Sequence, residues 1–158
     1  MIGNRKAFLD AIAWAEGTSR IPDSDDGYRV VVGGTLFYDY SDHPRQHVYI
    51  LRYKVYSTAA GRYQLLARYF DHYKATLCLP DFSPASQDAI ALRQIRERRA
   101  LPDIDDGLFA SAVNKVKNIW ASLPGAGYGQ REQALADLRR VYIDAGGELN
   151  LSELLEDG

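Results

Sequence analysis

The stretch FLDAIAWAEGTSR, from Phe8 to Arg20, predicts a helix that ends on one carboxylate, Glu16. Phe8, Ile12 and Glu16 are spaced four residues apart, which places their side chains on the same face of a helix. Gly17 follows at once and is a typical helix stop. An acid therefore shares a face with apolar residues, at the helix end where a negative charge is least favourable.

Two effects are expected to raise the pKa of Glu16, namely burial among apolar groups and the partial negative charge of a helix C-terminus. A carboxyl that stays protonated near neutral pH can serve as a general acid. The alternative is a glutamate in a frayed last turn that reaches solvent or an arginine such as Arg20, and a lone acid near a helix end is more often of this kind. The stretch alone leaves both interpretations open.

The composition indicates one soluble globular domain spanning residues 1–158. Hydrophobic residues make up 46% of the 158 residues and charged residues 25%, which is ordinary for a compact domain. The net charge of -2 provides no general attraction to nucleic acid or to an anionic membrane. The sequence shows neither a signal peptide nor an apolar run of membrane-spanning length, so we expect a protein that stays in the cytoplasm unless something else releases it.

Apolar spacing and turn residues predict an α+β fold that is mostly helical. Residues 28–40, YRVVVGGTLFYDY, alternate around two glycines and predict a hairpin, and residues 57–65, STAAGRYQL, predict a third short strand. Asn4 is the expected cap of the first helix. Further helices are expected over segments that begin near residues 65, 83, 107 and 131, with Ser83 as a cap and Pro84 at the first position of one of them.

The single cysteine, Cys78, excludes an internal disulfide and a cysteine-rich metal site. Its apolar neighbours predict a buried thiol at a helix end. His43 and His47 are four residues apart, but Pro44 between them argues against a helix that could present both to a metal ion. No H-E-x-x-H motif is present, which makes a zinc amidase or peptidase a poor match.

Several segments taken together, and in order, resemble the lambda-type phage endolysins. They are RKAFLDAIAWAEGT (5–18), VVGGTLFYDYSDHPR (31–45), STAAGRYQLLARYFD (57–71), DFSPASQDAIALRQIRER (81–98) and NIWASLPGAGYGQ (118–130). That family consists of lytic transglycosylases of the lysozyme superfamily, which cleave bacterial cell-wall glycan. The resemblance implies a lysozyme-like fold, mostly helical with one small antiparallel sheet flanking a cleft. Two lip loops would border the cleft, matching residues 46–56 and the segment after Leu123.

The catalytic glutamate of that family matches Glu16 within AWAEGT. The resemblance implies that Glu16 protonates the oxygen between N-acetylmuramic acid and N-acetylglucosamine, after which the muramic C6 hydroxyl closes on C1 to give a 1,6-anhydro sugar. One carboxyl suffices because the nucleophile is already tethered to the substrate. Ser57, Gln64 and Tyr128 are the residues expected to bind the sugar. No cofactor and no metal are expected.

The partners implied are peptidoglycan glycan strands, with no nucleic acid and no stable membrane insertion. A monomer in the host cytoplasm would reach the wall only after a holin-type pore opens the inner membrane.

Alternatives remain at this stage for the activity and for the site. Most glycosidases use two carboxylates, and Asp39, Asp42, Asp71 and Asp88 are the candidates for a second one in a hydrolytic muramidase. Asp39 and Asp42 could equally be turn residues, and Asp71 and Asp88 are expected to be solvated. A catalytically silent glycan-binding protein is the third possibility.

The binding residues have structural alternatives too. Gln64 could be a satisfied strand amide, Ser57 a turn residue and Tyr128 an anchor of a glycine-rich turn, while Arg62 is expected to be a surface or structural charge. The 46–56 segment is rich in tyrosine and aliphatic residues, and it could pack as an added strand rather than a mobile lip.

Overall fold

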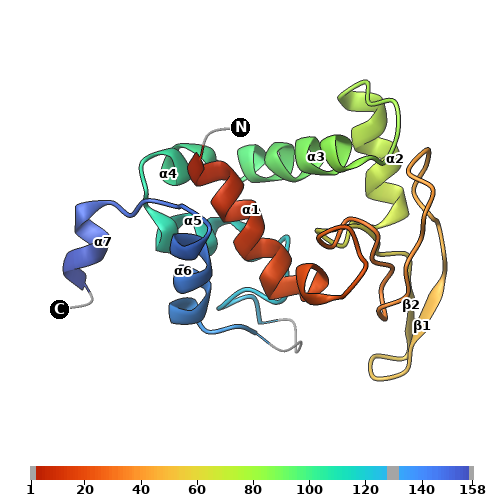
Figure 1. Ribbon diagram of the computed structural model, residues 1–158, viewed down its shortest axis with the longest axis horizontal. Coiled ribbons are helices and arrows are strands. Elements are labelled where there is room, and N and C mark those ends of the chain that lie inside the picture. Colours follow the sequence, from red (N-terminus) through yellow and green to blue (C-terminus); the bar gives the residue numbers. More distant parts are fainter. Residues whose placement is uncertain (1–2, 128–131, 157–158) are drawn as a thin grey trace. The chain divides into compact units, whose positions relative to one another are not determined.

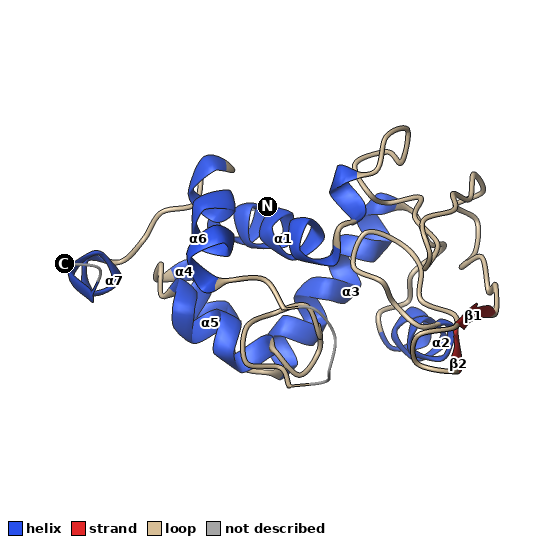
Figure 2. Cartoon of the chain, turned by 90° about the horizontal axis from the view of Figure 1, so that it is seen from below, coloured by secondary structure: helices blue, strands red, loops and turns tan. Residues whose placement is uncertain are grey.

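The structure is a computed structural model that describes residues 3–127 and 132–156, and it is mostly helical (Figures 1 and 2). The helices and strands follow one another in the order α1 (Gly3–Glu16), the 3₁₀ helix η1 (Thr18–Arg20), β1 (Val48–Ile50), β2 (Val55–Ser57), α2 (Ala67–Thr76), α3 (Pro84–Glu97), α4 (Leu101–Asp105), α5 (Phe109–Val116), α6 (Leu135–Asp144) and α7 (Leu151–Glu156). The prediction of a mostly helical fold with one small antiparallel sheet is confirmed.

The strands β1 and β2 form an antiparallel hairpin in which Tyr49 lies opposite Tyr56. This hairpin corresponds to the 46–56 segment, whose two halves pair with each other. The hairpin predicted over residues 28–40 is present only as an isolated bridge between Val30 and Leu36. The segment 57–65 likewise contributes isolated bridges through Ala60, which pairs with Val31 and Leu65. The two segments therefore pair where the sequence predicted, but through single bridges rather than continuous strands.

The chain divides into two compact units, one made of Met1–Ala15 with Leu92–Gly158 and the other of Glu16–Ala91. In the first unit, the buried ring of Phe109 packs edge-on against Phe8 and stacks on Tyr142, with ring centroids 5.7 and 4.6 Å apart. Burial of these large aromatic rings supplies much of the hydrophobic stabilisation of this unit.

Three features of the first unit differ from expectation. Asn4 lies inside α1 rather than capping it, and its amide holds the carbonyl of Ile104 and the N–H of Glu148 at 3.0 and 2.9 Å. The helices α4 and α7 were not predicted. The buried Glu153 of α7 accepts a 2.6 Å hydrogen bond from the backbone N–H of Ala110, which satisfies one of the unpaired donors at the start of α5.

The second unit has a core of aromatic and aliphatic side chains, namely Val31, Phe37, Ala60, Leu65, Phe70, Tyr73, Phe82 and Ile90. The helix α3 begins at Pro84, and the N–H of Ser86 lies 3.4 Å from the Ser83 hydroxyl oxygen, which confirms the predicted cap. The prediction for Cys78 is wrong, because its thiol is exposed just beyond α2. Its backbone has a φ of 52°, so the chain turns there instead of continuing the helix inward.

No helix in the part of the chain that the structure describes is long and apolar enough to cross a membrane.

Candidate active site

Glu16 is the last residue of α1, and its side chain is half-buried. On the same face of the helix, Phe8 and Ile12 are each only 1% exposed, which confirms the predicted inward face. Gly17 then adopts a φ of 84°, a left-handed conformation that a side chain would strain. The carboxyl of Glu16 is therefore held at a sharply defined helix end rather than on a long flexible turn.

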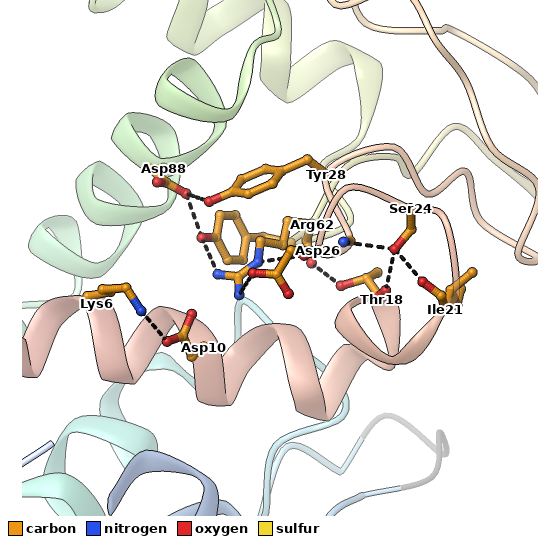
Figure 3. A network of polar contacts seen from close by, with 11 residues as sticks. Lys6, Asp10, Thr18, Ile21, Ser24, Asp26, Tyr28, Arg62 and Asp88 are labelled. Atoms are coloured by element: carbon orange, nitrogen blue, oxygen red, sulfur yellow. Dashed lines mark hydrogen bonds and ion pairs between the residues drawn. The ribbon is translucent and has the colours of Figure 1, made fainter. Parts of the chain in front are cut away.

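The loop after Glu16 is fixed by hydroxyl groups that hydrogen-bond to the backbone (Figure 3). The buried Thr18 hydroxyl donates to the carbonyl of Arg62 at 2.6 Å. The Ser24 hydroxyl donates to the carbonyl of Ile21 at 2.6 Å and accepts the N–H of Gly27 at 3.0 Å. A Cβ added at Gly27 would lie 2.8 Å from the Thr18 hydroxyl, so the loop can close only around a glycine.

Arg62 ties this loop to the segment 59–65 (Figure 3). Its side chain is only 4% exposed and pairs with Asp26 at 3.1 Å, while its Nε donates to the carbonyl of Asp26 at 2.8 Å. The guanidinium also lies over the ring of Tyr28, 5.2 Å from its centroid. The expectation of a structural charge is confirmed. Arg62 contacts the loop twice, through its side chain at Asp26 and through its carbonyl at Thr18.

Asp88 of α3 completes this network by accepting two tyrosine hydroxyls at one carboxylate oxygen, Tyr63 at 2.6 Å and Tyr28 at 2.9 Å. Burial, with the Asp88 charge in second place, raises the pKa of Tyr28 to about 12. Burial also raises the pKa of Tyr63. Both hydroxyls therefore stay protonated and act as donors. Asp88 is half-buried, so the expectation that it is solvated is wrong.

The other candidates for a second carboxylate also have structural partners. The exposed Asp39 accepts the backbone N–H of Ser41 at 2.8 Å, a turn contact that lowers its pKa. Asp42 and Asp71 both bind the guanidinium of Arg45. Hydrogen bonds from Arg45 lower the pKa of both carboxyls. Each of these acids is ionised at neutral pH and already paired.

Gln64 has a φ of 53°, which is unusual for a residue with a side chain. Its amide nitrogen donates to the carbonyls of Gly61 and Val30 at 2.9 and 3.3 Å. This geometry matches the satisfied amide that was weighed as an alternative to sugar binding. The two carbonyls fix the orientation of the amide, so its oxygen is the atom that could accept a hydrogen bond from a ligand.

Ser57 is the last residue of β2, and its hydroxyl accepts the N–H of Ala59 at 3.1 Å. It lines a cavity of about 450 Å³ at the base of the β1–β2 hairpin. The other lining residues are the charged and polar Arg45, His47, Thr58, Arg68 and Asp71, together with Tyr56, Leu66 and Ala67. Neither Glu16 nor Gln64 lines the cavity, so these predicted site residues are not gathered in it.

His43 serves the core rather than a metal. Its ring is buried 4.9 Å from that of Phe82, centroid to centroid. The N–H of Arg45 donates to Nδ1 at 2.9 Å, so the proton is on Nε2, which lies 2.8 Å from the carbonyl oxygen of Leu65. Burial lowers the pKa of His43. The described residues contain no group of three or more His, Cys, Asp or Glu side chains placed to hold a metal ion.

In the first unit, Glu132 accepts hydrogen bonds from the backbone of the segment that follows the buried Leu123. Its two carboxylate oxygens accept the N–H groups of Gly125 and Gly127 at 3.0 and 2.9 Å. These hydrogen bonds lower the pKa of Glu132. Tyr128, the third residue expected to bind sugar, lies outside the described residues.

Sequence reasoning did not find the contacts of Asp26, Asp88 and Glu132. The spacing of the partners explains this, since Asp88 is 60 residues from Tyr28 and 25 from Tyr63. For Glu132 a local signal did exist, because a carboxylate shortly after a glycine-rich turn can accept the turn's free N–H groups.

Comparisons with known proteins agree on one group. A family model described as Endolysin matches residues 6–149. The endolysin of Escherichia phage lambda is 57% identical over 145 residues, covering 90% of this chain and 91% of that protein. The endolysin of Escherichia phage P2 is 50% identical over 155 residues, covering 91% and 93%.

Solved structures give the same result. Bacteriophage lambda lysozyme complexed with a chitohexasaccharide matches with a TM-score of 0.91 and 55% identity, covering 95% of this chain and 98% of that chain. A second structure of lysozyme from bacteriophage lambda matches with a TM-score of 0.87 and 53% identity, with the same coverage. The predicted lysozyme-like α+β fold is confirmed.

Proposed function

Since this chain belongs to the endolysin family and is an enzyme of bacterial cell-wall lysis, we propose that it acts as a lytic transglycosylase on peptidoglycan. The bond cleaved is the β-1,4 bond between N-acetylmuramic acid and N-acetylglucosamine. Its glycan substrate is in keeping with the chitohexasaccharide bound by the related lambda lysozyme.

Glu16 is the acid and then the base of the proposed reaction. Its carboxyl gives a proton to the bridging oxygen, and the bond from that oxygen to C1 of the muramic sugar breaks. The C6 hydroxyl of the same sugar bonds to C1, and the ionised Glu16 removes the hydroxyl proton. The balance is one bond broken, one formed and no water consumed. The half-buried position of Glu16 at a rigid helix end supports this role.

The observation that carries the proposal is the state of the four other acids considered. Asp39, Asp42, Asp71 and Asp88 each accept hydrogen bonds within their own unit. A hydrolase needs a second carboxylate free to activate water or to attack C1. A substrate that supplies its own nucleophile removes that need, because an intramolecular hydroxyl has a high effective concentration.

Ser57, Gln64 and Tyr128 are proposed to bind the sugar. For Gln64 the amide oxygen is the contacting atom, since its nitrogen is held by two carbonyls. For Ser57 the hydroxyl proton is available to a ligand while its oxygen accepts the N–H of Ala59.

The products of digested peptidoglycan test the reaction. Mass spectrometry should find fragments ending in 1,6-anhydro-N-acetylmuramic acid, each lighter by one water than the hydrolysed fragment. Borohydride should leave these ends unchanged because they are not reducing. Reducing-end muropeptides as the main product would make the enzyme a hydrolytic muramidase, still with Glu16 as its acid. Binding of peptidoglycan without release of any fragment would make it a silent glycan-binding protein.

We also propose that the protein is a monomer that works as one catalytic domain and waits in the host cytoplasm for a holin-type pore. Lysis in the absence of any pore former would contradict the last part.

A further inference from the structure

The β1–β2 hairpin presents an exposed apolar face. Tyr49 and Tyr56 lie directly opposite one another in the two strands, with ring centroids 5.1 Å apart. Leu51, two residues beyond Tyr49, is 77% exposed, and Tyr56 is 70% exposed. The side chain of Val48, next to Tyr49, lies on the other face of the hairpin and packs against the core of its unit. Large side chains that could have been buried are thus turned outward together.

The hairpin lies within a stretch of sequence that carries only positive charges. Residues 43–70 include five arginines and lysines (Arg45, Arg52, Lys54, Arg62 and Arg68) and no acid. Arg62 is buried against Asp26, and Arg45 is paired with Asp42 and Asp71. Across the described residues, no carboxylate pairs with the other three cations. Arg52 and Lys54 lie in the turn of the hairpin, and Arg68 lies in α2, so the turn is cationic although the whole chain carries a net charge of -2.

The cations and the rings are close together. In the turn of the hairpin, Arg52 lies over the ring of Tyr53, 5.5 Å from its centroid. The turn 51–54, with Arg52, Tyr53 and Lys54, closes the hairpin at the end opposite α2 (Figure 1). Apolar and positive groups thus reach the same exposed tip.

We infer that this hairpin docks on the surface of an anionic phospholipid bilayer. Tyrosine rings favour the boundary between headgroups and acyl chains, and an exposed leucine gains free energy by entering it. Each lysine or arginine near the surface is attracted by anionic headgroups. The attachment is peripheral and does not depend on the proposed reaction, since none of these residues takes part in it.

A glycan strand fits this face less well than a lipid surface. Sugar rings stack on flat aromatic platforms, whereas the rings of Tyr49 and Tyr56 are inclined at 56° to one another. The exposed Leu51 has no use in sugar stacking but is suited to acyl chains. The unneutralised cations match the phosphate groups of lipids such as phosphatidylglycerol.

Co-sedimentation of the full chain with vesicles tests the inference. The protein should pellet with vesicles of phosphatidylglycerol and phosphatidylethanolamine, and far less with vesicles of phosphatidylcholine alone. Salt should weaken the binding because it screens exposed charges. The Arg52→Gln, Lys54→Gln double variant should bind roughly tenfold or more weakly, and Leu51→Ser about tenfold more weakly.

Matched control variants distinguish binding through the hairpin from non-specific binding of the protein to vesicles. Leu155 of α7 is 80% exposed, so Leu155→Ser removes an equally exposed leucine elsewhere. The Arg96→Gln, Arg98→Gln variant removes two exposed charges outside the hairpin. Both controls should bind like the parent protein, and circular dichroism should show all variants folded.

Three results would overturn the inference. They are equal pelleting with both kinds of vesicle, control variants that lose as much binding as the hairpin variants, and loss of binding to purified peptidoglycan with no change towards vesicles. The last result would assign the hairpin to the glycan instead.

Discussion

The hydroxyl of Tyr63 donates a 2.6 Å hydrogen bond to the same oxygen of Asp88 that accepts the hydroxyl of Tyr28 at 2.9 Å. An acid that could have been a second catalytic carboxylate is instead the anchor of two tyrosines. Through Tyr63 and Arg62, it also holds the loop that follows Glu16. Variants of Asp88 can therefore show whether this residue has a structural or a catalytic role.

Asp88→Asn should keep the lytic activity and lose little stability, about 1 kcal/mol, because the amide oxygen still accepts both hydroxyls. Asp88→Ala removes this acceptor from the hydroxyls of the buried Tyr63 and the half-buried Tyr28, and it should cost about 1–3 kcal/mol of unfolding free energy. Urea unfolding and a turbidity assay measure the two effects. A folded Asp88→Asn variant without lytic activity would instead identify Asp88 as a catalytic base.

Gly27 and Gly34 form a matched pair for testing the loop after Glu16. Both have positive φ, 93° and 99°, but only at Gly27 would a Cβ meet another group, the buried Thr18. Gly34→Ala should cost about 1 kcal/mol for the backbone alone. Gly27→Ala adds the clash, and we expect a clearly larger loss of stability with reduced lysis. Equal losses of thermal stability in the two variants would contradict this account of the loop.

Local sequence signals correctly predicted two helix ends. The Ser83–Pro84 pair fixed the start of α3, and the spacing of Phe8 and Ile12 with Gly17 fixed the end of α1. These signals lie within a few residues of the structure they specify, so no tertiary information is needed.

Features set by distant partners could not be predicted in this way. Asp88 depends on tyrosines far away in the sequence, and Asn4 joins α1 to residues 100 and 144 positions later. The positive φ of Gln64 has no local signal, because the residue is not a glycine. The position of Glu16 was predicted from spacing, whereas its catalytic role came from resemblance and stays a prediction.

His43 makes stability depend on pH. Burial lowers its pKa in the folded state, so the unfolded chain binds a proton more readily. Its contribution is complete above the unfolded pKa of about 6.5 and is lost as pH falls from there toward the folded value. The melting temperature should therefore fall between about pH 7.5 and about pH 5.5. His43→Leu should flatten this slope, whereas His47→Gln, at an exposed position, should retain it.

Glu16→Gln should abolish wall lysis and leave the fold intact, since the amide keeps the shape of the side chain but cannot exchange the proton. Loss of general acid–base action should cost about 10²–10⁴-fold or more in rate. Glu97→Gln, at an exposed position of α3, is the matched control and should lyse normally. Turbidity of permeabilised Gram-negative cells measures the rate, and thermal unfolding checks the fold. Chelator should leave the parent enzyme active, because the proposed steps use only the carboxyl and the substrate's own hydroxyl. Near-normal lysis by a folded Glu16→Gln variant would remove Glu16 from the mechanism, and the one-carboxylate reaction would fall with it.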